Sequence, residues 1–330
     1  MDNNIILLTG HRKCGTTLFL NLFDHHPKLC CYPWDLHLLF AYFPEFLKNN
    51  QRKNILLKRL ETIICENVKD KIIKFNLKHL DSNIFNQSFL NLLKNNSLDD
   101  PAHVIRSLIK AWSRLVLEED RSISVIKEVS SEIYAGELYD WFPNLKIIQL
   151  IRDPRDNYAS LKSGVSNYYK KLGENENETL ASLLHRGLLE MKLALINENR
   201  FGADRYMVIR FEDLVSNPES SMRKVSSFIG IDFNKSMLQP TVCGFPTPGN
   251  NFDKIKMFSV TNKNVSRWSN RITKKEAKII EFYFKGVMEQ FGYNAKFSDK
   301  QQSEAVGEYY KWLNYRYYYH DRFIMGLKKP

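Results

Sequence analysis

Short apolar runs and segments with helical spacing alternate along much of the chain. Continuous apolar runs, typical of strands buried on both faces of a parallel sheet, lie within residues 5–10, 122–129, 145–153 and 205–214. Segments with apolar residues at helical spacing separate the runs, and Pro27, Pro143 and Gly230 mark the ends of three of them. Residues 28–33 fit either a further strand or a loop. Strands that alternate with helices form βαβ units, so the pattern predicts an α/β fold with a central parallel sheet.

A different pattern fills residues 35–118, which show no strand-like alternation and are rich in Leu, Ile, Lys and Asn. Within this region, Asp99-Asp100-Pro101 is typical of a helix start. The sequence therefore predicts one domain with two additions, at these bounds: 1–330 for the domain, about 45–118 for a helical insertion, and about 296–330 for an aromatic and basic C-terminal extension.

Residues 10–17, Gly-His-Arg-Lys-Cys-Gly-Thr-Thr, follow the first apolar run and precede a helical segment. Gly10 and Gly15 have the spacing of a phosphate-binding P-loop, in which backbone N–H groups and the helix N-terminus hold an anion. A P-loop kinase also needs a lysine directly after the second glycine, but Thr16 occupies that position and the lysine is Lys13. The loop therefore predicts a bound phosphate and disfavours ATP hydrolysis or phosphoryl transfer.

A second candidate anion site follows the apolar run that ends at Ile151. Arg152 stands at the carboxyl end of this strand, which is the usual ligand edge of an open α/β sheet, and Ser160 follows eight residues later. An arginine and a serine hydroxyl in this arrangement can hold an anionic group. Alternatively, Arg152 pairs with Asp153 or Asp156 and only closes the turn. Taken together, the two motifs predict a ligand with two separated anionic groups.

The same two motifs, residues 10–17 and 151–163, resemble the sulfotransferases that use 3′-phosphoadenosine 5′-phosphosulfate (PAPS). Residues 207–231 and 264–293 resemble later segments of that family, and the resemblance is closer to its bacterial, carbohydrate and tyrosyl-protein branches than to the cytosolic phenol and steroid branch. It implies a parallel sheet with a P-loop-like strand–loop–helix and flanking helices. It also implies an enzyme that moves the sulfonate of PAPS to a hydroxyl or an amine of a small-molecule acceptor by in-line displacement, without a metal ion. The resemblance covers about residues 3–45 and 121–293.

Several residues of this sequence match positions with known roles in the family. Lys13 matches the lysine that contacts the oxygen between phosphate and sulfonate, where it would neutralise charge on the leaving phosphate. Lys127 matches the lysine that binds the transferring sulfonate. Arg152 and Ser160 match the 3′-phosphate site, and Phe211 matches the aromatic residue beside the adenine. The residues that the resemblance assigns to cofactor binding are Arg12, Lys13, Cys14, Gly15, Thr16, Thr17, Arg152, Ser160, Phe211 and, in the late loop over the 3′-phosphate, Arg267.

The residue that accepts the proton is the least defined part of the expected site. In the cytosolic branch a histidine is the general base, but Val129 stands at the matching position. Other branches place an acidic base shortly after the first helix, where this chain has Asp35 and, two residues later, His37. We favour Asp35 over His37, with Glu128 and His11 as further candidates. Asp35 is also typical of an N-cap for the apolar segment that follows it.

The composition limits the range of partners only coarsely. Lys and Arg total 48 against 37 Asp and Glu, a net charge of +11, which suits an anionic ligand, an acidic partner or a nucleic acid. The five cysteines show no CxxC or CxxH spacing, which favours a reducing compartment and argues against a zinc site. We therefore expect a cytoplasmic protein without a metal ion or a membrane span.

Aromatic residues alternate with Lys and Arg at 308–330 and support other interpretations. Such a tail can stack on bases or contact a membrane surface, although packing on this domain or on a second subunit of a homo-oligomer is commoner. The alternatives to a sulfotransferase are therefore a nucleotide-binding or basic interaction protein without transferase activity, and an atypical P-loop kinase. Nucleic-acid binding is not favoured.

Overall fold

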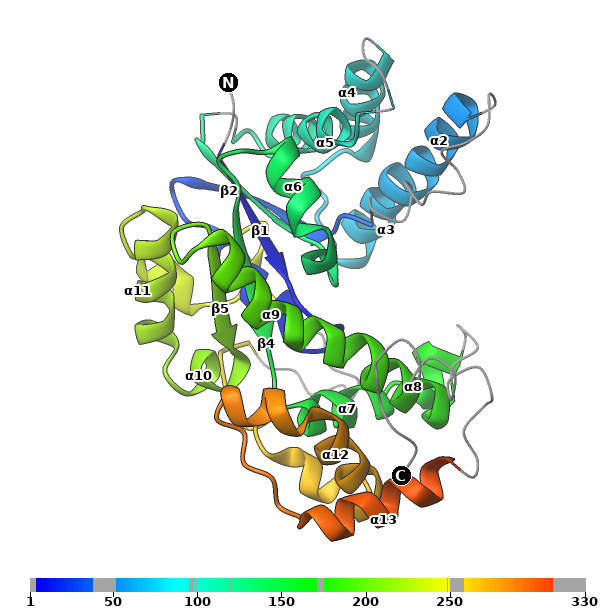
Figure 1. Ribbon diagram of the computed structural model, residues 1–330. Helices are drawn as coiled ribbons and strands as arrows, with labels where there is room; N and C mark the ends of the chain where they lie inside the picture. The colour runs from blue at the N-terminus through cyan, green and yellow to red at the C-terminus, as the bar shows by residue number, and fades with distance from the viewer. Residues whose placement is uncertain are drawn as a thin grey trace.

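The computed structural model describes residues 4–37, 52–94, 98, 100–118, 120–170, 175–247, 249 and 258–310. A five-stranded sheet lies at its centre, with the strand order β2-β3-β1-β4-β5 and all neighbours parallel (Figure 1). The predicted α/β fold is confirmed, and the segment left open between strand and loop forms most of β2. The strands are β1 (Asn4–Thr9), β2 (Leu29–Asp35), β3 (Ile123–Lys127), β4 (Lys146–Ile151) and β5 (Tyr206–Arg210).

Strand β1 forms the middle of the sheet because its side chains are apolar on both faces. All of its residues after Asn4 are buried. In the register of the sheet, Leu8 lies opposite Lys127 of β3 on one side and Ile148 of β4 on the other. This continuous burial is what a parallel sheet covered by helices requires.

Helices connect the strands and cover the sheet (Figure 1). Gly230 ends one of them in the left-handed region, with φ 83°, as the sequence predicts. Within the part of the chain that the structure describes, no helix is long and apolar enough to cross a bilayer. The helices outside the insertion are α1 (Thr16–Asn21), α6 (Ala135–Trp141), α7 (Pro154–Lys162), α8 (Glu176–Ser182), α9 (Leu188–Phe201), α10 (Phe211–Ser216), α11 (Pro218–Ile229), α12 (Lys274–Gln290) and α13 (Asp299–Tyr310). Shorter elements are the 3-10 turns η4 (Ser131–Tyr134), η7 (Lys235–Leu238) and η8 (Arg267–Asn270), the π-helical turns η5 (Val165–Tyr169) and η6 (Leu183–Gly187), and the two-stranded hairpin of β6 (Thr241–Val242) and β7 (Phe245–Pro246).

The described part of the predicted insertion is helical, and its helices lie together beside one end of the sheet (Figure 1). Helix α5 begins at Pro101, as the sequence predicts, and the Asp100 carboxylate caps it by accepting a hydrogen bond from the Ala102 N–H at 2.9 Å. Residues 38–51 and 311–330 lie outside the described residues, so part of the predicted insertion and most of the predicted tail are not described. The insertion helices are α2 (Arg52–Leu60), α3 (Asn67–Lys74), α4 (Ser82–Lys94) and α5 (Pro101–Leu115), with the π-helical turn η3 (Glu61–Glu66) between the first two.

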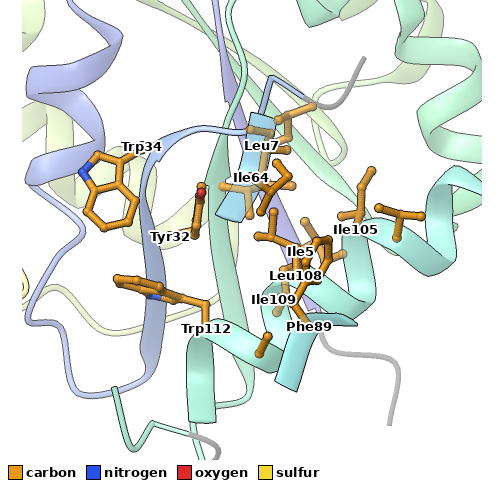
Figure 2. Packing of buried hydrophobic residues seen from close by; sticks show 14 of the residues in the cluster. Ile5, Leu7, Tyr32, Trp34, Ile64, Phe89, Ile105, Leu108, Ile109 and Trp112 are labelled. Carbon is orange, nitrogen blue, oxygen red and sulfur yellow. The ribbon is translucent and has the colours of Figure 1, made fainter. Parts of the chain in front are cut away.

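An aromatic cluster joins the insertion to the edge strand β2. Figure 2 shows Tyr32 and Trp34 of β2 beside Trp112 of α5, and the ring centres of Trp34 and Trp112 are 5.1 Å apart. The Trp112 indole N–H donates to the carbonyl oxygen of Cys31 at 2.8 Å. Burial of aromatic surface and this hydrogen bond fix β2 against the insertion, and so they fix the position of Asp35 at the end of β2.

The carboxyl ends of the five parallel strands meet at one edge of the sheet. The loop after β1 carries the glycine motif, β4 leads directly into Arg152, and β5 leads into Phe211. Strands β2 and β3 end at Asp35 and Lys127. This edge is the usual ligand site of an open α/β sheet, so the fold brings the residues of all predicted motifs to one place.

Candidate active site

The loop between β1 and α1 has the backbone of an anion-binding nest. Lys13 and Gly15 adopt positive φ angles of 67° and 109°, which turn successive N–H groups toward a common centre. Its carbonyl groups are held from outside the loop. Asn157 donates to the Arg12 carbonyl oxygen at 3.0 Å and Arg152 donates to that of Lys13 at 3.2 Å. The loop can therefore present its N–H groups to an anion.

A cleft of about 580 Å³ opens at this edge of the sheet. Of the sequence-predicted site residues, every one except Cys14 lines it. Cys14 is 1% exposed and its thiol points into the protein, where burial raises the pKa of the thiol. A ligand in the cleft could therefore meet only the backbone of Cys14, and the predicted role of this residue in cofactor binding stays a prediction. The predicted residues that line the cleft are Arg12, Lys13, Gly15, Thr16, Thr17, Asp35, His37, Lys127, Arg152, Ser160, Phe211 and Arg267.

Arg152 faces the cleft and does not close its own turn. Its guanidinium donates to the Lys13 carbonyl, to the Ser160 hydroxyl at 3.1 Å and to the Asn264 carbonyl at 2.7 Å. The neighbouring Asp153 instead binds Arg155, at 2.7 Å. The alternative that Arg152 pairs with Asp153 is therefore wrong, because Arg155 of the same motif binds Asp153. The charge of Arg152 does act on the other alternative partner, Asp156, but the two form no ion pair within the described part of the chain.

Asp156 anchors the late loop over the cleft. Its carboxylate accepts hydrogen bonds from the Ser266 N–H at 2.6 Å and the Trp268 N–H at 2.8 Å. Burial raises the pKa of Asp156 to about 6. Arg267, which lies between these two residues, donates to the Asn264 side chain at 2.5 Å. Sequence reasoning missed this anchoring role, although Asp156 belongs to the recognised motif.

Phe211 packs against both candidate anion sites, the loop at Gly15 and the Arg152 guanidinium. It is 5% exposed, and the Arg152 guanidinium lies 4.5 Å from the centre of its ring. A Cβ atom placed on Gly15 would lie 2.5 Å from the same ring. Only glycine therefore lets the loop approach Phe211 this closely. A contact between Phe211 and an adenine stays a prediction.

Lys127 and Asp35 form an ion pair at the other end of the cleft. The Lys127 Nζ lies 2.5 Å from Asp35 Oδ1 and 3.4 Å from Thr17 Oγ1. Burial alone would raise the pKa of Asp35, but the charge and hydrogen bond of Lys127 outweigh burial and hold that pKa below its usual value. Burial lowers the pKa of His37, which lines the same part of the cleft. A carboxylate and an imidazole thus face the same space, each able to accept a proton.

Two further candidate bases point away from the cleft. Glu128 is 1% exposed, and burial raises the pKa of its carboxyl to about 8. It is therefore protonated at neutral pH. His11 is 7% exposed, with its Nδ1 2.7 Å from a carboxylate oxygen of Glu190. Neither side chain lines the cleft. The sequence also suggests Asp35 as the N-cap of a following helix. Most of that expected helix lies in residues 38–51, outside the described part of the chain.

The structure adds residues to the cleft that the sequence analysis did not identify. They come from the insertion and from segments after α7, and of these only Arg271 lies in a segment that carries the family resemblance, residues 264–293. No group of three or more His, Cys, Asp and Glu side chains suited to a metal ion occurs within the described ranges. The added charged and aromatic lining residues are Lys71, Lys74, Tyr169, Arg186 and Arg271.

The matching family model and the two curated relatives described below are sulfotransferases. A family model described as "Sulfotransferase family" matches residues 6–235. Human carbohydrate sulfotransferase 1 is 27% identical over 172 residues, which are 48% of this chain and 41% of that protein. Human carbohydrate sulfotransferase 6 is 23% identical over 212 residues, 60% of this chain and 52% of that protein. The chain thus spans about half or less of the length of these curated relatives.

Solved structures share the fold over most of the chain. The sulfotransferase domain from the curacin biosynthetic pathway has a TM-score of 0.59 at 18% identity, covering 88% of this chain and 98% of that one. The sulfotransferase domain of the olefin synthase from Synechococcus PCC 7002 has a TM-score of 0.52 at 19% identity, with coverages of 88% and 95%. The architecture around the cleft is therefore one that known sulfotransferase domains also have.

Proposed function

Because the chain belongs to the sulfotransferase family, we propose that it transfers the sulfonate of PAPS to a hydroxyl or an amine of a small-molecule acceptor. One observation carries the proposal: two anion-binding sites, the nest at residues 10–15 and the Arg152 guanidinium, line the same cleft as the Asp35–Lys127 ion pair. A donor with separated anionic groups fits the first two, and the ion pair marks where the acceptor would enter.

The surroundings of Arg152 fit the 3′-phosphate of PAPS. The guanidinium is 8% exposed, and the three groups that accept its hydrogen bonds are uncharged. Its Nε atom has no hydrogen-bond partner among the described residues. Asp156 acts on this nearly buried cation through its charge but accepts no hydrogen bond from it, so a bound anion would stabilise the cation further. A phosphate is one of the anions whose geometry matches the planar guanidinium.

The nest and Lys13 fit the 5′ end of the donor. When bound, PAPS supplies a sulfonate on a phosphate that is a good leaving group. The backbone N–H groups of the loop would hold that phosphate. Lys13 would stabilise the negative charge that grows on the phosphate as the bond to sulfur breaks. This role explains why the lysine sits within the loop and not after Gly15, where a kinase needs it to reach a γ-phosphate.

Asp35 and Lys127 fit the acceptor end. Asp35 would take the proton from the acceptor as the acceptor oxygen or nitrogen forms its bond to sulfur, while the electrons of the broken sulfur–oxygen bond remain on the phosphate. Lys127, 2.5 Å from Asp35 and close to Thr17, would bind the sulfonate oxygens during transfer. His37 is the second candidate for the proton acceptor.

Donor binding and transfer can be tested directly. Adenosine 3′,5′-bisphosphate (PAP), the product left by the donor, should raise the melting temperature of the full chain, and ATP with magnesium should not. Label from [35S]PAPS should then appear in a mixture of small phenols, alcohols and amines. Stabilisation by ATP with magnesium and not by PAP would favour the kinase interpretation. Stabilisation by neither would favour an interaction protein.

The proton acceptor can be assigned with two variants. Asp35→Asn should lower kcat by roughly 100- to 10,000-fold, the usual contribution of a general base, while PAP binding persists. His37→Ala should lower it much less. Because Asp35→Asn also leaves the buried Lys127 unpaired, the variants must first be shown to bind PAP normally. If Asp35→Asn leaves kcat unchanged and His37→Ala abolishes activity, His37 is the residue that accepts the proton.

A further inference from the structure

Among the described residues that line the cleft, cationic side chains clearly outnumber carboxylates, even with Arg186 set aside because it binds Glu190 at 3.0 Å. PAPS has about four negative charges near neutral pH, two of them on the 3′-phosphate. Within the described residues, the carboxylates that line the cleft are those of Asp35 and Asp156. Its cationic lining residues are Arg12, Lys13, Lys71, Lys74, Lys127, Arg152, Arg186, Arg267 and Arg271.

Two of these cations come from the insertion, remote from the donor motifs in sequence. Lys71 and Lys74 lie three residues apart on α3, a spacing that places them on one face of the helix, and both line the cleft. Helix α3 belongs to the group of helices at one end of the molecule, whereas α7, which carries Ser160, lies toward the other end (Figure 1). The two lysines thus approach the cleft from the side opposite the 3′-phosphate site.

Lys71 lies within electrostatic reach of the residues proposed for transfer. Burial lowers the pKa of Lys71, and the charges of Lys74 and Lys127 lower it further, while Asp35 acts in the opposite direction. Asp35 is already bound by Lys127 at 2.5 Å. No ion pair of Lys71 or Lys74 with a carboxylate is found in the described part of the chain. Two neighbouring ammonium groups therefore repel each other beside the acceptor end of the cleft.

A bound anion would remove this repulsion. Resting on the proposed transfer at Asp35, we propose that the acceptor carries an anionic group, such as a carboxylate, a phosphate or a sulfate ester, and that Lys71 and Lys74 bind this group while the acceptor hydroxyl or amine reaches Asp35. Ammonium groups bind oxyanions as flexible point charges, so the site selects for charge more than for shape. The two lysines are then specificity residues, and the transfer itself depends on Lys13, Lys127 and Asp35.

The test offers acceptors in matched pairs, each as an acid and as its primary amide: 4-hydroxyphenylacetate with its amide, and 3-hydroxybutyrate with its amide. With the wild-type chain, kcat/KM should be higher for the acid by roughly 10- to 100-fold, the effect of about one charge-assisted hydrogen bond. The double variant Lys71→Gln/Lys74→Gln should lose this preference and use the amides as well as the wild type does. Lys69→Gln is the matched control, because Lys69 is exposed on the same helix and does not line the cleft.

A binding measurement separates this inference from the proposed function. Each acid and amide is titrated into the PAP-saturated chain by calorimetry, which needs no turnover. Stronger binding of the acids to the wild type and to Lys69→Gln, but not to the double variant, supports the inference. Equal or undetectable binding of the acids and amides, or an acid preference that survives in the double variant, overturns it. Failure of PAP itself to bind would instead overturn the proposed function.

Discussion

Replacement of Arg152 by alanine tests the donor site most directly. The guanidinium donates to the Lys13 carbonyl, the Ser160 hydroxyl and the Asn264 carbonyl, and it lies above the ring of Phe211. All of these partners are uncharged, so the charge of Arg152 remains available for a ligand. If it binds the 3′-phosphate, Arg152→Ala should weaken PAP binding far more than binding of a nucleotide without that phosphate.

The expected magnitude follows from the burial of the guanidinium. Hydrogen bonds to charged groups contribute about 1.5–3 kcal/mol each, which corresponds to a roughly 10- to 150-fold change in Kd. Arg152 is only 8% exposed, so water and salt screen its charge less than they screen a surface pair. We therefore expect the loss for PAP to fall in the upper half of this range.

Calorimetric titration with PAP and with adenosine 5′-monophosphate, which lacks the 3′-phosphate, provides the assay. Arg152→Ala should change the Kd for the monophosphate less than about threefold, because the backbone N–H groups of the loop would still hold the 5′-phosphate. Arg223→Ala is the control for loss of one positive charge, since Arg223 is exposed on α11 and bound to Glu219. Equal losses for both nucleotides would show that Arg152 only supports the loop, and would refute the assignment.

Four further variants test the loop, helix α12 and a buried carboxyl group. Lys13→Ala should lower kcat by roughly 100- to 1,000-fold, measured by sulfonate transfer, with a smaller loss of PAP affinity because the backbone N–H groups remain. Gly15→Ala places a Cβ 2.5 Å from the Phe211 ring at a φ of 109°, and should lower the free energy of unfolding by about 1–3 kcal/mol in urea titrations. Gly286→Ala, in α12 with no heavy atom within 4 Å of the new Cβ, should instead raise it by about 0.5–1 kcal/mol. Burial raises the pKa of Glu128 to about 8 in the folded chain, from 4.5 in the unfolded chain, so its contribution to stability should fall as pH rises between these values. Glu128→Gln should therefore make the fall of wild-type stability smaller, while the raised pKa of Asp156 keeps its own part of that fall.

The placement of the proposed donor residues at one edge of the sheet could be predicted from the sequence because its signals are local. Glycine spacing fixes the loop between β1 and α1, and a strand end fixes Arg152. The partners within the second motif could not be assigned in this way. Arg152, Asp153, Arg155 and Asp156 are close enough in sequence to pair in several ways, and the choice depends on distant groups. Arg155 binds Glu281 of α12 as well as Asp153, so Asp153 is paired with Arg155 while Arg152 faces the cleft.

Strand β2 shows why the acceptor half was harder to predict. Its sequence contains Pro33, which cannot donate to a sheet and is tolerated at an edge or a bulge. The structure has both features, because β2 is an edge strand and its register with β3 shifts between Cys31 and Asp35. The shift places Asp35 opposite Lys127, a pairing that neither segment indicates alone. Lys71 and Lys74 carry no sequence signal either, since exposed lysines on a helix are common.

The proposed donor half and the proposed acceptor half of the cleft are therefore formed by different parts of the chain. The nest, Arg152 and Phe211 come from β1, β4 and β5, and they contact one another directly. Asp35 is held by an edge strand that depends on Trp112 of the insertion for its position. The same insertion contributes Lys71 and Lys74 to the cleft wall. Changes in the insertion can thus alter the acceptor that reaches Asp35 while the donor site keeps its internal contacts, which is how one fold could serve acceptors of different chemistry.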